Sequence, residues 1–163
     1  MKHAKISAVL VAFVLLAGIF PCILRAQSAK QGLMFGTWKL NVAKSDFGEN
    51  PKPQAMLVKV ESDTPELVQF SVTMTAANGM AFSYSYKGAA DGKDYPATGT
   101  SSTYAYTETD GAVTEVEKDS DGTVTKGTFA VLPNGKVGVW TYTVTDAQGN
   151  VTHEKLVYDR VAV

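Results

Sequence analysis

The chain is punctuated by six dipeptides in which glycine stands beside asparagine or aspartate, and the segments between them are rich in Val, Thr, Tyr and Phe. Glycine adopts a positive φ freely, and asparagine and aspartate tolerate it better than most residues, so such pairs suit the type I′ turns of β-hairpins. Their repetition between β-prone runs predicts a meander of antiparallel strands. The dipeptides are Asn78-Gly79, Asp91-Gly92, Asp110-Gly111, Asp121-Gly122, Asn134-Gly135 and Gly149-Asn150.

The runs between these turns predict nine or ten strands. In several of them apolar and polar residues alternate with a period of two, which is typical of a strand with one buried face. No segment after residue 26 has an apolar stripe of helical spacing. The expected strands are 35–41, 55–61, 66–75, 80–87, 95–98, 102–108, 112–118, 123–132, 136–145 and 151–160.

The connections between these strands favour a barrel over a sandwich. Only the segment 42–54 is long, and its Pro51 and Pro53 make it a connection rather than a central strand. Sandwiches usually need Greek-key crossovers, whereas hairpins throughout suit an up-and-down barrel, whose closure removes exposed sheet edges. We therefore predict an all-β fold: a single up-and-down antiparallel β-barrel of about 8–10 strands with no substantial helix.

Residues 1–26 have the pattern of a cleaved signal peptide. The basic residues Lys2 and Lys5 precede an apolar run over 6–20, and Ala26 is a small residue suited to cleavage. The run is shorter than the about 20 residues that a transmembrane helix needs. We therefore expect an exported protein, either periplasmic or secreted, with no stable membrane insertion after cleavage.

The remaining chain divides into a flexible leader over 27–34 and a barrel domain over 35–163. Cys22 raises the alternative of a lipoprotein, but Pro21 stands where a lipobox has a small residue. An outer-membrane barrel is a weaker alternative, because the faces opposite the aromatic residues carry Ser, Thr and Lys, which suit water. The sequence predicts no oligomeric state.

The mature composition excludes several kinds of site. Loss of Lys2, Lys5 and Arg25 leaves 12 basic against 16 acidic residues, a net charge of −4, so we expect no nucleic-acid partner. No cysteine remains, and His153 is the one histidine left, so no zinc cluster is predicted. The stretch Asp119–Gly122 lacks the acid that closes a calcium loop and is better explained as a turn. We predict neither metal nor cofactor.

The chain resembles secreted bacterial lipocalin-like proteins of largely uncharacterised function, over most of its mature length. The resemblance implies a calycin-type β-barrel and export. The Thr-Asp-Tyr motif of many lipocalins is absent, so the likeness is to calycin-like barrels rather than to lipocalins proper. The segments that carry it are Gly36-Thr37-Trp38-Lys39-Leu40-Asn41, Lys44-Ser45-x-Phe47 and Asp91-Gly92-Lys93-Asp94-Tyr95-Pro96.

The same resemblance implies how such a barrel closes at its base. In lipocalins and related barrels a Gly-x-Trp opens the first strand, and the indole packs against an arginine from near the end of the last strand. Gly36, Trp38 and Arg160 match these positions. A guanidinium can stack on an indole while it donates to nearby carbonyls, which gives the pairing a physical basis.

Aromatic residues on alternating positions are the candidate ligand-lining set. A barrel of this size has room for side chains or for one small ligand, and tyrosine offers an apolar ring with a hydrogen-bonding hydroxyl. The alternatives are that the rings fill a solid core or lie outside the barrel. The set is Phe82, Tyr84, Tyr86, Tyr104, Tyr106, Trp140 and Tyr142.

Three functions remain open at this stage. The leading one is a binding module for a small apolar or amphipathic molecule held inside the barrel. The second is an envelope protein-interaction barrel with a filled core. The third is an enzyme that uses a tyrosine or a carboxylate in the cup, which we rank last because His153 stands alone and no catalytic constellation is visible.

Overall fold

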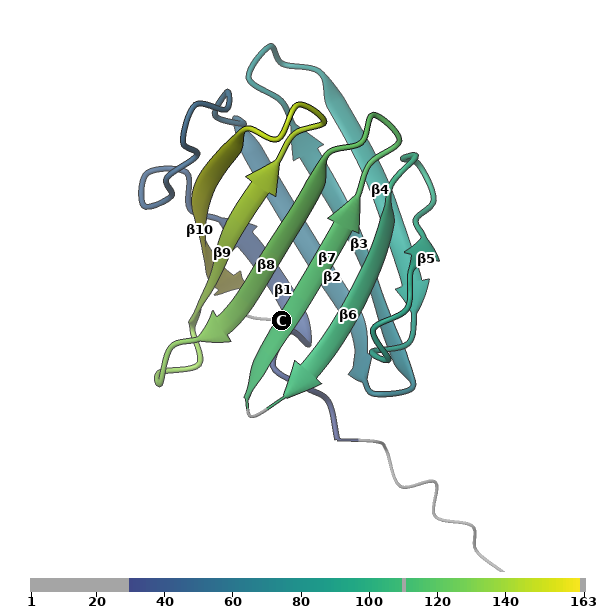
Figure 1. The fold of residues 1–163 in the computed structure, drawn as a ribbon. Coiled ribbons are helices and arrows are strands. Elements are labelled where there is room, and N and C mark those ends of the chain that lie inside the picture. The colour runs from purple at the N-terminus through teal and green to yellow at the C-terminus, as the bar shows by residue number, and fades with distance from the viewer. Residues whose placement is uncertain (1–29, 110, 162–163) are drawn as a thin grey trace, which may run out of the picture.

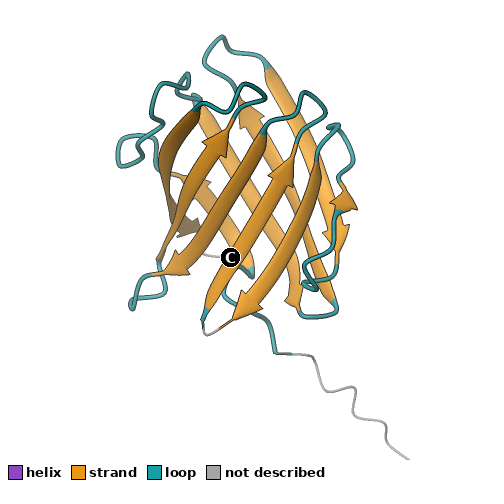
Figure 2. Ribbon diagram, viewed as in Figure 1, coloured by secondary structure: helices purple, strands orange, loops and turns teal. Residues whose placement is uncertain are grey.

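The computed structural model describes residues 30–109 and 111–161, which form ten antiparallel strands without a helix (Figures 1 and 2). Within these residues no helix is long and apolar enough to cross a lipid bilayer. The strands are β1 (Gly36–Leu40), β2 (Ala55–Thr64), β3 (Leu67–Thr75), β4 (Ala81–Gly88), β5 (Tyr95–Pro96), β6 (Thr103–Thr109), β7 (Ala112–Lys118), β8 (Val124–Val131), β9 (Val137–Thr145) and β10 (Val151–Val161).

The strands form one sheet that curls into a nearly closed barrel. Their order is β4-β3-β2-β1-β10-β9-β8-β7-β6-β5, so most neighbours are joined by hairpins, and the first strand pairs with the last. The two ends of the sheet meet where Ser85 and Thr98 exchange two backbone hydrogen bonds of 2.9 and 2.8 Å. The prediction of an all-β, up-and-down antiparallel barrel is confirmed.

The dipeptides at 78–79, 121–122, 134–135 and 149–150 lie in hairpin loops of more than two residues, whereas Asp91-Gly92 lies in the connection between β4 and β5, where Asp91 bridges to Thr107. Two residues separate Thr109 from its partner Ala112, as a two-residue hairpin requires. At Gly122 and Gly149 the loops have three residues and end in a glycine with φ of 91° and 86°. In the last of these loops Asp146 Oδ1 accepts the backbone N–H of Gln148 at 2.9 Å, an arrangement that favours the longer turn.

The connection over 42–54 runs beside β10 rather than free in solvent. Asp46 and Lys155 exchange two backbone hydrogen bonds of 2.8 Å, and Ser45 Oγ accepts the backbone N–H of Val157 at 2.9 Å. Phe47 is buried and belongs to the hydrophobic core. The long connection therefore extends the edge of the barrel and contributes one ring to its interior.

The described part of the N-terminal leader, residues 30–34, is held against the barrel by Asp63. The backbone N–H of Gly32 donates to the Asp63 carbonyl at 2.6 Å, and that of Met34 donates to Asp63 Oδ2 at 2.7 Å. Burial raises the pKa of the Asp63 carboxyl, against the lowering effect of the Met34 hydrogen bond. Met34 is thereby fixed as a buried core residue.

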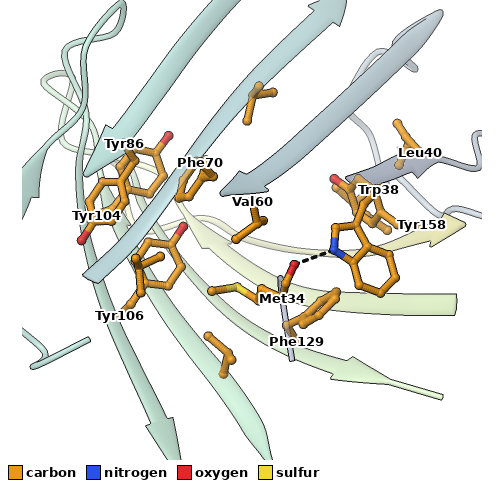
Figure 3. Close-up of a cluster of buried hydrophobic side chains, with 14 of the residues drawn as sticks. Met34, Trp38, Leu40, Val60, Phe70, Tyr86, Tyr104, Tyr106, Phe129 and Tyr158 are labelled. Atoms are coloured by element: carbon orange, nitrogen blue, oxygen red, sulfur yellow. Dashed lines mark hydrogen bonds between the residues drawn. The ribbon is translucent and has the colours of Figure 1, made fainter. Parts of the chain in front are cut away.

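Trp38 and Arg160 lie together at the base of the barrel, where β1 pairs with β10. The Arg160 guanidinium carbon is 4.0 Å from the centroid of the Trp38 ring. The indole N–H donates to the Met34 carbonyl at 2.7 Å, the bond dashed in Figure 3. The guanidinium also donates to three backbone carbonyls, those of Gly135, Phe35 and Leu33.

The core above this base is an aromatic cluster around Phe70 (Figure 3). Phe70 stacks on Tyr86 with ring centroids 5.2 Å apart and meets Tyr106 edge to face at 5.9 Å. Tyr104 lies parallel to Tyr106, at 6.4 Å and 8°. Such arrangements contribute stability beyond the burial of apolar area.

We predict that Arg160→Lys lowers the free energy of unfolding by about 2 kcal/mol, because an ammonium cannot reach three carbonyls while lying over the indole. Urea denaturation measures the change. Lys59→Met is the matched control, because Lys59 makes one exposed ion pair, with Glu61, and we expect no measurable effect. Equal destabilisation by the two variants would contradict this role for Arg160.

Candidate functional site: an aromatic and acidic cavity

A cavity of about 90 Å³ lies inside the barrel, within a wider cup of about 610 Å³ that includes its opening to solvent. Its wall combines apolar side chains with six that carry hydroxyl or carboxyl groups. The apolar residues are Met34, Trp38, Met56, Val58, Val60, Phe70, Val72, Phe129 and Trp140. The polar residues are Tyr84, Tyr106, Glu115, Glu117, Tyr142 and Tyr158.

Two tyrosine–glutamate pairs join β6 to β7 beside this cavity. The antiparallel register sets Tyr106 opposite Glu115 and Tyr104 opposite Glu117. Tyr106 donates its hydroxyl to Glu115 Oε2, and Tyr104 donates to Glu117 Oε1 at 2.6 Å. Because residues two apart share a face, the two pairs lie one above the other on the inner side of the sheet.

Glu115 is one of two buried acids among the described residues, and neither has a cation as partner; Asp63 accepts a backbone N–H, whereas the Glu115 carboxyl borders the cavity. The residue is 6% exposed. Tyr106 donates to one carboxyl oxygen, and the other oxygen is not among the fully buried atoms that lack a partner in the described chain. No lysine, arginine or histidine of the described chain lines the cavity. Isolated buried charges are costly, so this environment favours the neutral acid.

The pKa values of both carboxyls follow from this environment. Burial raises the pKa of Glu115 to about 8, with the Tyr106 hydrogen bond partly opposing the shift and the nearby Glu117 adding to it. Burial also raises the pKa of Glu117, again against a hydrogen bond, from Tyr104. Glu115 is therefore largely protonated at neutral pH in the empty barrel, although a bound positive charge would favour its ionised form.

The tyrosines of the cavity stay protonated. Burial is the largest cause of the raised pKa of Tyr106 and Tyr142, and the charge of Glu115 is the second. The pKa values of Tyr84 and Tyr158 are raised as well, with burial again first. These hydroxyls can therefore donate or accept hydrogen bonds but do not supply phenolate at physiological pH.

Gly127 on β8 makes room for the aromatic wall. It pairs with Glu115 on one side and with Tyr142 on the other. A Cβ atom at this position would collide with Cε1 of the Tyr142 ring, so the ring lies against the backbone of β8. Trp140 stacks with Tyr142 at 5.2 Å and 11°. The absence of a side chain at Gly127 therefore leaves room for the Tyr142 ring beside the backbone of β8, where it lines the cavity.

The seven predicted ligand-lining residues divide between the cavity and its surroundings. Tyr84, Tyr106, Trp140 and Tyr142 line the cavity. Tyr86 and Tyr104 are buried in the core cluster outside it, and the Tyr86 hydroxyl is buried without a partner in the described chain. Phe82 is 47% exposed near the start of β4.

His153 lies on the exposed face of β10, away from the cavity. Its Nδ1 is 3.2 Å from Thr143 Oγ1 on β9. No group of three or more histidine, cysteine, aspartate or glutamate side chains within the described residues is placed to hold a metal ion.

Sequence reasoning missed the two glutamates, which carry the charge of the site. The signal was available: a two-residue turn at 110–111 places residues at equal distances from it opposite each other, which pairs Tyr106 with Glu115. It also missed Phe70, Phe129 and Tyr158, whose places in the wall depend on the curvature of the whole sheet.

No family model matches the chain, and no curated protein matches it either. Among solved structures it is similar to EF1p2_mFAP2b bound to DFHBI, with 12% identity and a TM-score of 0.44, over 79% of this chain and 94% of that one. It is also similar to secretory abundant heat soluble protein 4 from Ramazzottius varieornatus, with 14% identity and a TM-score of 0.47, over 84% of this chain and 100% of that one. The nearly closed antiparallel barrel is consistent with a calycin-like fold.

We predict that Glu115→Gln stabilises the protein increasingly as the pH rises from about 5 to about 8. In the unfolded chain the carboxyl has its ordinary pKa, near 4.5, whereas in the folded barrel the pKa is about 8. Between these values folding takes up a proton, so the wild type loses stability with rising pH and the amide does not. The full difference is several kcal/mol, at about 1.4 kcal/mol for each unit of pKa shift.

Urea denaturation at intervals between pH 4.5 and pH 9 measures this difference. Glu66→Gln, at an exposed position in the turn between β2 and β3, is the matched control. Its difference in stability from the wild type should not change with pH. A pH-independent effect of Glu115→Gln would mean that the carboxyl is not held in a desolvated site.

Proposed function

We propose that this protein is a binding barrel that holds a small apolar or amphipathic molecule in its interior. The observation that carries the proposal is the cavity, whose wall combines aromatic rings with the buried carboxyl of Glu115. An apolar interior with a few converging polar groups is the usual character of a small-molecule site.

The energetic cost of Glu115 supports a role in binding over a role in packing. A carboxyl without a cation destabilises the barrel above its ordinary pKa, and an apolar residue of similar volume would fill the same space without that cost. Ionisable groups with strongly shifted pKa values gather at functional sites for this reason. A solid core gives no reason for an acid at this position.

The size of the cavity limits the ligand. At about 90 Å³ it is smaller than typical ligand pockets, which measure about 300–1,000 Å³, and smaller than an engineered cavity of about 150 Å³ that takes benzene. We infer that only a small headgroup occupies the cavity, and that any longer part of the molecule lies at its opening to solvent.

We also propose that the protein is exported and acts by binding rather than by catalysis. Export rests on the signal-like pattern of residues 1–26, which lie outside the described residues. The binding role rests on the tyrosine hydroxyls, which stay protonated, and on the place of His153 on the outer face of the barrel.

A second candidate is a protein-interaction barrel. The observation that favours it is the exposure of two large apolar side chains next to each other near the start of β4: Met80 is 68% exposed and Phe82 is 47% exposed. Exposed apolar residues that cluster can mark a contact surface. In that function the small cavity would be a packing gap.

We predict that Gly127→Ala weakens the binding of small aromatic probes at least about tenfold, because the added methyl group displaces the Tyr142 ring into the cavity. NMR titration of the purified barrel with toluene, indole and octanoate measures the affinities. Thr128→Ala, at the next position of β8 and on its exposed face, is the matched control and should bind like the wild type.

Circular dichroism of both variants checks that the fold is retained. Denaturing extraction of the purified protein, followed by mass spectrometry, searches for a molecule that copurifies. If no molecule copurifies and none of the three probes binds the wild type, the interaction barrel becomes the better account.

A further inference from the structure

We propose that the molecule held in the cavity is a small organic cation, an amine or a quaternary ammonium, with its charged nitrogen beside Glu115 and close to the aromatic rings of Trp140 and Tyr142 on β9. This inference rests on the proposed binding function and names the chemical class of the ligand. It follows from the two carboxyl groups, the aromatic rings and the lack of a basic side chain among the described residues of the cavity wall.

The wall offers two carboxyl groups, which a bound cation would favour in their ionised form. Its two ionisable acids, Glu115 and Glu117, come from one strand and face the interior together. No basic side chain of the described residues lines the cavity. Arg160, which lies over Trp38, is committed to three backbone carbonyls and is not part of the wall.

Aromatic rings share the cavity wall with these acids. Tyr142 and Trp140 both line the cavity, and their rings are parallel within 11° with centroids 5.2 Å apart. Tyr84 forms a second stacked pair with Tyr104, at 6.0 Å and 8°. The face of an aromatic ring carries the negative part of its quadrupole and attracts an ammonium, most strongly where water is excluded.

Other ligand classes fit this wall less well. An anion would meet two carboxyl groups with no cation to balance them. A purely apolar molecule would bury the second oxygen of Glu115 without a partner, which costs free energy. A cation satisfies that oxygen, pairs with the ionised carboxylate in a desolvated site and gains from the ring faces.

Binding of a permanent cation should then depend on pH. The titratable groups that interact with Glu115 are Glu117 on β7 and the tyrosines Tyr106 on β6, Tyr84 and Tyr86 on β4, Tyr142 on β9 and Tyr158 on β10. The tyrosines stay neutral, so the change in charge comes from the glutamates. Because the raised pKa of Glu115 keeps it neutral below about 8, the affinity should rise with pH up to that value.

Three water-soluble probes of one shape test the charge preference. They are choline, its uncharged carbon isostere 3,3-dimethylbutan-1-ol, and the anion 3,3-dimethylbutanoate. Affinities are measured by NMR titration at pH 6 and pH 8.5 for the wild type, Glu115→Gln, Glu117→Gln and the exposed control Glu66→Gln. We expect choline to bind the wild type at least about tenfold more tightly than either isostere at pH 8.5.

The variants identify the group responsible. We expect Glu115→Gln to weaken choline binding at least about tenfold and to abolish the rise of choline affinity with pH. The affinity for the neutral isostere should stay within about threefold of the wild-type value. Glu117→Gln should have a smaller effect in the same direction, and Glu66→Gln should have none. This pattern would support the cation site, because a merely structural carboxyl would alter the three probes alike.

The outcomes separate this inference from the proposed function. If the neutral or the anionic probe binds as tightly as choline, or if Glu115→Gln leaves choline binding unchanged, the cation site is overturned while the binding barrel stands. If none of these probes binds, and toluene, indole and octanoate also fail, both proposals are overturned.

Discussion

The pairing of the first strand with the last is the constraint on which the rest of the barrel depends. β1 and β10 are joined by a register that sets Trp38 opposite Arg160, and every other strand pairing links strands that are consecutive in sequence, as does the seam at Ser85 and Thr98. With these two junctions made, the sheet curls into a nearly closed barrel. The inner faces of all ten strands then meet in one enclosed core.

At the base of the barrel, Arg160 connects several segments of the chain. The guanidinium lies over the indole and donates to carbonyls near the start of β1 and in the turn before β9, while Asp63 on β2 holds the chain at Met34. These contacts fix the floor of the cavity, because Met34 and Trp38 are part of its wall. Polar contacts to the backbone therefore hold Met34 and Trp38 in place at the base of the cavity.

The cavity sets the stability of the barrel against the binding role that we propose for it. Apolar rings fill most of the interior, yet Glu115 sits among them as an acid whose ionisation the barrel opposes. Folded proteins retain such groups where they serve a function and compensate elsewhere for the destabilisation. Here the stacked aromatic rings and the tyrosine–glutamate hydrogen bonds provide that compensation.

The glycine turns and the alternation of residues by themselves determined the strands, their order along the chain and the barrel, because hairpin geometry and the two-residue period are local properties. The hairpin at 110–111 also determined that Tyr106 opposes Glu115. Only the tertiary structure decided which rings border a cavity: Tyr86 and Tyr104 pack into the core, whereas Tyr158, Phe70 and Phe129 join the wall. These side chains come from strands far apart in sequence, and their distances depend on the curvature of the closed sheet and on the space left at Gly127, which no local pattern specifies.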